Sequence, residues 1–348
     1  MNKINEYIIF IFVETFASIL IGISIISFIL YYYNYDVIKG LEMLLISGFQ
    51  NIFNIEYMLG RSTFIILTAL AFSIPFLCGL FNIGGEGQMY LGGLVCLVIA
   101  FYFQNPLLAI ILGGLAGAAL ALIAVLIRIY RGGSEVITTI MLNWILYFLV
   151  IYLVITQLYD RLVPHESVKV PKGIRLGSID IGFLELNTIF IIAIIFVILI
   201  YLFLNYTKIG YEIKVVGYSR KTAEYAGINI NKVYIYSMFI GGFSAGLSGA
   251  LNVIGYTYFI DSLLSSMYGL GFIGIGVALM GRNNPIGIIF AGIFFSNLVI
   301  GGQNMQTSIG VAKELTDALI GILIIALAFP LAYRMLLRYI KIRKGVHE

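Results

Sequence analysis

The sequence predicts an all-α polytopic membrane protein with about ten transmembrane helices, and three observations lead to this fold class. First, 61% of the 348 residues are hydrophobic and 11% are charged, whereas about a quarter of residues are charged in soluble globular domains. Second, uncharged apolar runs of about 20 residues, long enough to cross a hydrocarbon core, recur along the chain. Third, these runs are continuous rather than alternating, which favours helices over the strands of a membrane barrel.

The predicted helices form two groups on either side of a polar centre. In the first helical half, residues 7–206, we expect helices at 7–33, 62–80, 88–103, 107–127, 135–158 and 186–206. In the second half, residues 233–334, we expect helices at 233–254, 267–280, 286–300 and 316–333. Residues 34–60 suggest an outside loop with an amphipathic turn, and Pro75 is expected to bend its helix.

The distribution of charge predicts the orientation. Lys and Arg resist translocation and therefore gather on the cytoplasmic side. With the N-terminus inside and an even number of spans, that side holds most of the 21 Lys and Arg, including the central stretch 207–232 and the basic tail 335–348. Both termini are then cytoplasmic, and the polar loop 159–185 faces outward, as Asp261 also does.

The central stretch 207–232 interrupts the apolar sequence with five basic and two acidic residues. Its middle, 220–227, predicts a short helix, because Ser219 can cap the first turn and Gly227 can end the last one. A short helix exposed between two membrane halves suits docking onto a soluble protein. A solvated connector fits the same charge pattern equally well.

Residues 81–93 read FNIGGEGQMYLGG and predict a break between two membrane helices. The core of this segment, residues 84–87, disfavours regular helix because of its glycines. Irregular backbone at membrane depth is tolerated where protein buries it or a watery cavity adjoins it. We therefore interpret Asn82, Glu86 and Gln88 as candidate substrate-pathway residues. The alternative is a cytoplasmic turn in which Glu86 stabilises the next helix through its dipole.

A second polar patch runs from Ser134 to Asn143. Thr139 and Asn143 are four residues apart and share a helix face, with Glu135 one turn earlier. In lipid such a face requires a partner helix or water. Thr138, Thr139 and Asn143 are therefore further pathway candidates, with helix–helix hydrogen bonding as the alternative. The glycine-rich segments 241–255 and 269–281 predict close helix packing instead.

Several function classes find no support in the sequence. There is no Gly-Lys dipeptide and hence no phosphate-binding loop, and neither of the two histidines belongs to an HExxH motif or a catalytic triad. We therefore expect no enzyme activity, catalytic residue or metal site in this chain. Cys78 and Cys96 lie in apolar segments and are expected to be packing residues. The net charge of +4 requires no nucleic-acid partner, because the basic residues lie at span ends.

The segments FNIGGEGQMYLGG, EVITTIMLN, VVGYSRKTAEYAGI and GLGFIGIGVALMGRNNPIGIIFAG occur in this order between about 81 and 302. Together they closely resemble the membrane permease subunits of bacterial ABC importers for branched-chain amino acids, ribose and nucleosides. The first two are most similar to the nucleoside/simple-sugar branch. The resemblance implies one transmembrane permease domain over residues 1–348, with the type II importer fold of ten helices, in the cytoplasmic membrane of a bacterium.

The same resemblance implies the partners. The stretch 207–232 would dock on a cytoplasmic ABC ATPase, which binds ATP and Mg, so that this chain itself carries no cofactor. By this similarity, the ATPase-coupling residues are Gly217, Arg220, Ala223, Glu224, Tyr225, Ala226 and Gly227. A second permease chain would complete a heterodimer in the membrane lipid, and an extracellular solute-binding lipoprotein would deliver the solute.

The expected function is ATP-driven import of a nucleoside, with a ribose-like simple sugar as the alternative. The scarcity of basic residues within the spans argues against a phosphorylated or carboxylate substrate, which would require Arg or Lys. A rival from another class is an ion-coupled secondary transporter that uses Glu86 or Glu135 and needs no ATPase.

Overall fold

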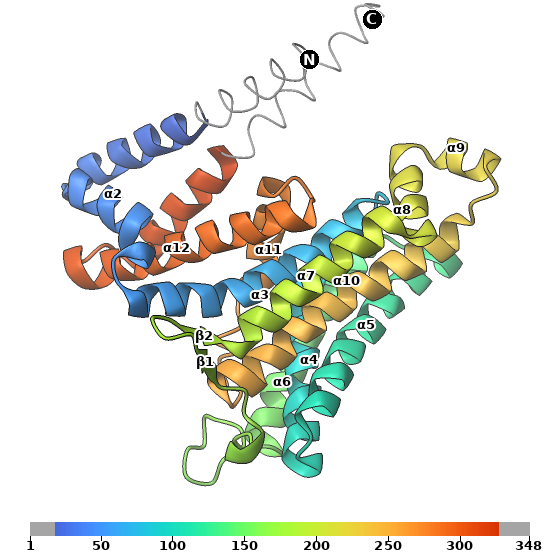
Figure 1. Ribbon diagram of the computed structural model, residues 1–348, viewed down its shortest axis with the longest axis horizontal. Helices are drawn as coiled ribbons and strands as arrows, with labels where there is room; N and C mark the ends of the chain where they lie inside the picture. Colours follow the sequence, from blue (N-terminus) through green and yellow to red (C-terminus); the bar gives the residue numbers. More distant parts are fainter. Residues whose placement is uncertain (1–17, 327–348) are drawn as a thin grey trace, which may run out of the picture. The chain divides into compact units, whose positions relative to one another are not determined.

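The computed structural model describes residues 18–326, and this part of the chain is mainly helical (Figure 1). Seven helices among the described residues are long and apolar enough to cross a membrane, which confirms the all-α polytopic class. They are α3 (Ile52–Phe76), α4 (Gly85–Phe103), α5 (Pro106–Arg131), α6 (Glu135–Thr156), α7 (Thr188–Tyr206), α10 (Ile230–Asn252, continued by the π-helical turn η3, Val253–Thr257) and α12 (Pro285–Ile309). Two shorter apolar helices are Ser18–Tyr32 and α11 (Leu270–Met280). The predicted termini, with the basic tail 335–348, lie outside the described residues.

The described residues form two compact units. The larger unit comprises residues 56–294, and the smaller comprises 18–55 together with 295–326. The division falls inside α3 and α12 rather than at the central stretch 207–232. All candidate pathway and coupling residues belong to the larger unit.

The smaller unit corrects the prediction that residues 34–60 form an outside loop. This segment contains α2 (Val37–Ile46), the 3₁₀ turn η1 (Ser47–Phe49) and the first turns of α3. The polar residues that suggested a loop cap these helices: Asp36 accepts a hydrogen bond from the Lys39 amide at 3.0 Å, and Asn51 accepts one from the Asn54 amide at 2.7 Å. Helix caps and loops use the same residue types, so composition alone did not separate them.

The core of the larger unit forms where α10 packs against α4 and α5, and Figure 1 shows α10 running beside α5. The helices meet at glycines. A Cβ on Gly92 of α4 would overlap the backbone of Gly246 in α10, and a Cβ on Gly246 would lie 2.5 Å from the Gly113 carbonyl oxygen of α5. This confirms that the glycines of 241–255 serve close packing. Ser244 of α10 also donates a hydrogen bond to the Leu67 carbonyl of α3 at 2.7 Å.

At one end of this unit, the polar segment between α6 and α7 folds onto the segment that follows α10. It contains the 3₁₀ turn η2 (Lys172–Ile174) and the antiparallel strands β1 (Ser178–Asp180) and β2 (Glu185–Asn187). The Ser167 amide donates to the Ile260 carbonyl at 2.9 Å, and Glu166 and Asp261 pair as an isolated bridge. The predicted outward loop 159–185 and Asp261 therefore form one surface.

At the other end, the central stretch folds into two helices, α8 (Lys208–Tyr218) and α9 (Arg220–Tyr225). The short helix α9 was predicted, and its signals are confirmed: Ser219 accepts from the Thr222 amide at 3.3 Å, and Gly227 has φ +75°. The Ile228 amide then donates to the Ala223 carbonyl at 3.0 Å, which completes a Schellman stop. Residues 208–218, for which the sequence analysis named no element, form α8, because Thr207 caps the helix and Ile213 and Val216 are buried.

Candidate functional site

The break between α3 and α4 comprises residues 77–84 and follows directly from Pro75. Proline has no N–H, so the carbonyl four residues earlier loses its helical partner. That carbonyl belongs to Ala71, and the Asn82 side chain donates to it at 3.0 Å. Pro75, which we expected to bend a helix reaching residue 80, instead lies beside the last residue of α3. The chain leaves the helix there, and Asn82 replaces the missing hydrogen bond.

Asn82 and Gln88 close the break with a reciprocal pair of amide hydrogen bonds. Asn82 Nδ2 donates to Gln88 Oε1 at 3.1 Å, and Gln88 Nε2 donates to Asn82 Oδ1 at 3.0 Å. The Gly84 amide also donates to Asn82 Oδ1 at 3.1 Å. Both side chains are buried. These two predicted pathway residues are therefore engaged in holding the backbone.

The prediction that residues 84–87 are not regular helix is wrong, because α4 begins at Gly85. Glu86 and Gln88 consequently lie in the first turns of α4, where a carboxylate also stabilises the positive end of the helix dipole. Position 87 requires glycine because Asn143 of α6 lies against it. The Gly87 amide donates to Asn143 Oδ1 at 2.8 Å, and a Cβ at position 87 would lie 2.8 Å from that oxygen. Tertiary contact with α6 thus outweighs the low helix propensity of glycine.

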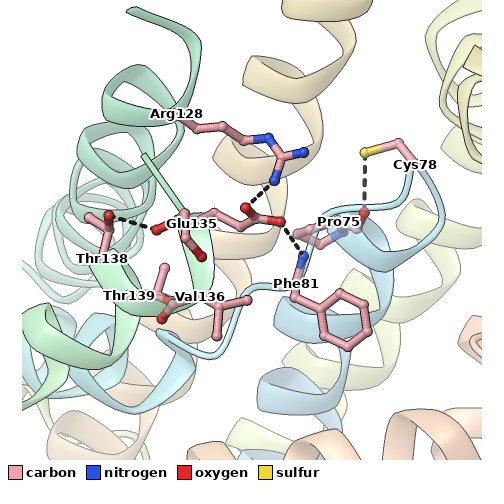
Figure 2. A network of polar contacts seen from close by, with 9 residues as sticks. Pro75, Cys78, Phe81, Arg128, Glu135, Val136, Thr138 and Thr139 are labelled. Carbon is pink, nitrogen blue, oxygen red and sulfur yellow. Dashed lines mark hydrogen bonds and ion pairs between the residues drawn. The ribbon is translucent and has the colours of Figure 1, made fainter. Parts of the chain in front are cut away.

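The second polar patch lies on α6, and the structure separates its members. Asn143 Nδ2 donates to the Ile83 carbonyl at 2.9 Å, so Asn143 contacts the break and the start of α4 together. Thr139 is buried, as the shared face predicts, and its hydroxyl donates to the Val136 carbonyl of its own helix at 3.1 Å. Thr138 is only half-buried and bonds to the Ser134 carbonyl at 2.9 Å (Figure 2).

An ion pair ties the α5–α6 turn to the break. Arg128, in the last turn of α5, pairs with Glu135, in the first turn of α6, and Glu135 Oε1 accepts from the Phe81 amide at 3.4 Å (Figure 2). The Arg128 and Arg220 guanidinium carbons lie 5.4 and 5.6 Å from the ring centroid of Tyr234. The sequence analysis did not identify this ion pair, although only Gly132, Gly133 and Ser134 separate the ends of α5 and α6.

Glu86 lies in a small cavity of about 100 Å³. Its side chain is 5% exposed, and Oε1 accepts hydrogen bonds from the Tyr90 hydroxyl and from the Gly269 amide, the latter at 3.1 Å. Oε2 is buried and has no hydrogen-bond partner among the protein atoms. The Phe272 amide also interacts with this carboxylate, but Oε2 has no hydrogen bond of ordinary geometry to a protein atom.

Aromatic rings form most of the cavity wall. Tyr90 comes from α4, Trp144 and Tyr147 from α6, Phe272 from α11, and Tyr268 from the turn before α11. Tyr147 lies 5.8 Å from Trp144 and 6.1 Å from both Tyr90 and Tyr268, measured between ring centroids. The sequence analysis did not identify this set, because the rings come from three separate segments.

Two of the seven predicted coupling residues, Gly217 and Arg220, lie against the break. A Cβ on Gly217 of α8 would overlap the Leu77 carbonyl, and the ideal Cβ position of Gly79 is 3.9 Å from an Arg220 guanidinium nitrogen. Ala223 is buried, whereas Glu224, Tyr225, Ala226 and Gly227 are exposed. Tyr225 is 94% exposed. One side of the α8–α9 segment therefore contacts the break, and the other is open.

A second cavity, of about 480 Å³, adjoins α8. Lys214, Gly217 and Tyr218 line it from α8, and Arg282 and Asn283 line it from the turn between α11 and α12. Its charged side chains are basic, in keeping with a cytoplasmic position.

Neither cysteine offers a reactive group. Cys78 and Cys96 are free and buried, and Cys78 Sγ lies 3.1 Å from Ser237 Oγ. Burial raises the pKa of the Cys78 thiol to about 11, so it stays protonated at neutral pH. Among the described residues, no group of His, Cys, Asp and Glu could hold a metal ion.

Comparison with known proteins gives consistent matches. Residues 54–328 match the family described as branched-chain amino acid transport system / permease component. The guanosine ABC transporter permease protein NupP of Bacillus subtilis is 30% identical, over 95% of this chain and 96% of that protein. The nucleoside ABC transporter permease protein NupB of Lactococcus lactis is 32% identical, over 92% and 91%. The glucose ABC transporter permease protein TsgB13 of Haloferax volcanii is 27% identical, over 87% and 84%.

Proposed function

The chain belongs to the family of permease components of branched-chain amino acid transport systems, and from this premise we propose that it imports a nucleoside. It acts as the membrane subunit of an ATP-driven ABC importer in the cytoplasmic membrane of a bacterium. The observation that carries this proposal is similarity to guanosine and nucleoside permeases over more than nine-tenths of each chain. A simple sugar is the second candidate, favoured by the glucose permease at lower identity.

The ATPase of this importer docks on the α8–α9 segment. The exposed residues of α9, including Glu224 and Tyr225, and the basic cavity beside α8 form a surface suited to a soluble partner. That partner binds ATP and Mg, and this chain binds neither. The coupling residues are those that the family resemblance named, from Gly217 to Gly227.

Contacts within the larger unit supply a route from that surface to the cavity. Gly217 and Arg220 lie against the break, so displacement of α8 and α9 displaces residues 77–84. Asn143 bonds both the break and the start of α4, one residue from Glu86. Movement at the ATPase surface therefore reaches the Glu86 cavity through backbone contacts and hydrogen bonds.

Two further partners complete the importer. A solute-binding lipoprotein delivers the solute to the surface formed by residues 159–185 and Asp261. A second, different permease chain covers the exposed aromatic side of the Glu86 cavity, and membrane lipid covers the remaining apolar faces. The solute passes between the two permeases along Glu86 and Asn143.

Uptake into vesicles that contain the complete importer tests the proposal. We expect labelled nucleoside to accumulate with ATP and to compete with unlabelled nucleosides rather than with ribose or glucose. Accumulation driven by an ion gradient with ATP withheld would instead support the secondary-transporter rival. Preferential competition by ribose or glucose would favour the sugar alternative.

Replacement of Glu224 tests the coupling surface. Glu224→Ala should lower uptake and nucleoside-stimulated ATP hydrolysis together, by roughly the tenfold that corresponds to about 1.4 kcal/mol of docking energy. Capture of solute by the binding protein should persist. Glu42→Ala, at an exposed glutamate of α2, is the matched control and should leave both rates unchanged. Normal uptake in Glu224→Ala would show that this surface does not couple.

A further inference from the structure

The open oxygen of Glu86 indicates that its cavity receives a hydrogen-bond donor. Buried polar atoms in proteins normally have partners, and Glu86 Oε2 has none among the protein atoms. The carboxylate cannot rotate to find one without losing the Tyr90 hydroxyl and the Gly269 amide, which hold Oε1. A ligand that offers a hydrogen-bond donor suits this position.

The surroundings of Glu86 restrict the kind of ligand. Asn143 also lines the cavity, and its amide is already bonded to the Gly87 amide and the Ile83 carbonyl, which leaves it one N–H group and one acceptor position. Apart from the Glu86 oxygen, the wall is mainly aromatic, and aromatic faces stack on flat rings. A sugar has hydroxyl groups all around its ring, and each would require a polar partner. A flat heterocycle confines its polar atoms to its edge and leaves two apolar faces for stacking, which suits an aromatic wall with one carboxylate oxygen.

We propose that this cavity binds the base of a nucleoside. The base stacks among Trp144, Tyr147 and Tyr268, and an N–H group on its edge donates to Glu86 Oε2. The cavity of about 100 Å³ is smaller than the 300–1,000 Å³ of drug-sized sites, and it receives the base while the ribose projects past Trp144 and Phe272, which are 53% and 55% exposed. The assignment rests on the proposed function and deepens it, because it names the substrate group and the residues that recognise it.

The chain carries its own reporter for this site, because Trp144 is the single tryptophan of the sequence. In the purified full-length chain in lipid nanodiscs, titration with guanosine, adenosine and uridine should change Trp144 fluorescence saturably. Ribose and glucose at the same concentrations should leave it unchanged. Saturation by ribose or glucose, or no response to any nucleoside at millimolar concentration, would overturn the proposal.

Two variants test the roles of the residues. Glu86→Gln keeps the shape of the side chain, but only one of its two terminal atoms can accept hydrogen bonds. The apparent dissociation constant for the nucleoside should therefore rise at least tenfold. Phe272→Leu removes one ring at a position exposed enough to tolerate the change and should also weaken binding. The matched controls Glu42→Gln and Phe290→Leu lie outside the cavity and should bind as the parent chain does. Unchanged affinity in both Glu86→Gln and Phe272→Leu would contradict the proposal.

The binding and uptake measurements separate this inference from the proposed function. Absence of a nucleoside response, with ATP-driven nucleoside uptake intact, would remove the base-binding site and leave the importer. Saturable binding that depends on Glu86, with uptake driven by an ion gradient, would retain the site and remove the ATP-driven importer.

Discussion

Asn82 uses every hydrogen-bonding position of its side chain on the backbone break and on Gln88. Its two N–H groups reach the Ala71 carbonyl and Gln88, and its oxygen accepts from Gln88 and the Gly84 amide. The sequence analysis treated Asn82 and Glu86 alike, as polar residues at a break. The structure separates them, because Asn82 is saturated by protein groups whereas Glu86 keeps an open oxygen. Sequence reveals which groups are polar, but not which of them the fold has already satisfied.

At this scale we predict the effect of removing the Asn82 amide. Asn82→Ala leaves the Ala71 carbonyl and the Gln88 amide buried without partners, and should destabilise the chain by about 1–3 kcal/mol. The thermal midpoint of the purified chain measures this loss. Thr138→Ala, which removes a hydroxyl bonded only within its own helix, should stay within about 0.5 kcal/mol of the parent. Equal midpoints for Asn82→Ala and the parent would show that the amide pair contributes nothing to stability.

At the scale of the element, the sequence predicted the presence of the membrane helices better than the residues at which they begin and end. The apolar runs located α4 to α7, α10 and α12, and the local signals of Ser219 and Gly227 located α9. The polar residues near Asn51 were interpreted as part of a loop, although they cap helices. The sequence analysis therefore missed the start of α3. Because of the glycines at 84–87, the sequence analysis placed the start of α4 too late. These glycines allow close contact with a neighbouring helix and do not mark a turn. The periodicity of apolar residues gives no information about a neighbouring helix that comes into contact only in the folded chain.

The short helix α9 depends on its glycine stop, which gives a second prediction. Gly227 has φ +75° and open space around its Cβ position, so Gly227→Ala meets no clash but costs about 1–2 kcal/mol in a left-handed conformation. We expect uptake and stimulated ATP hydrolysis to fall by up to about tenfold. Gly227→Asn should retain more of both rates, because Asn tolerates this conformation. Equal activity in the two variants would indicate that the stop does not control coupling.

At the scale of the molecule, the membrane orientation stays a prediction from charge, and the larger unit supplies the two polar surfaces to which it applies. Arg128 and Arg220 share the ring of Tyr234, while the polar segment 159–187 folds onto the region around Asp261. Charge counting could anticipate the two polar surfaces, because it depends on sequence position alone. It could not anticipate the aromatic cavity, whose rings come from α4, α6 and the start of α11 and meet only in the folded chain.

Orientation gives the last prediction. Leu162 is 90% exposed in the polar segment between α6 and α7, and Tyr225 is 94% exposed on α9. A membrane-impermeant maleimide should label Leu162→Cys in intact cells and Tyr225→Cys only in inside-out vesicles. The native cysteines are buried and should contribute little background. Labelling of Tyr225→Cys from outside the cell would place α9 on the exterior and remove the ATPase from the mechanism.

The glycine contacts of α10 with α4 and α5 also bear on how such a pore can open. Where backbones touch directly, no side chain lies between them that could change rotamer and let one helix slide past another. These three helices should therefore shift together as a rigid block. The conformational change of alternating access would then occur at the break, residues 77–84, and displacement of α9 would drive it.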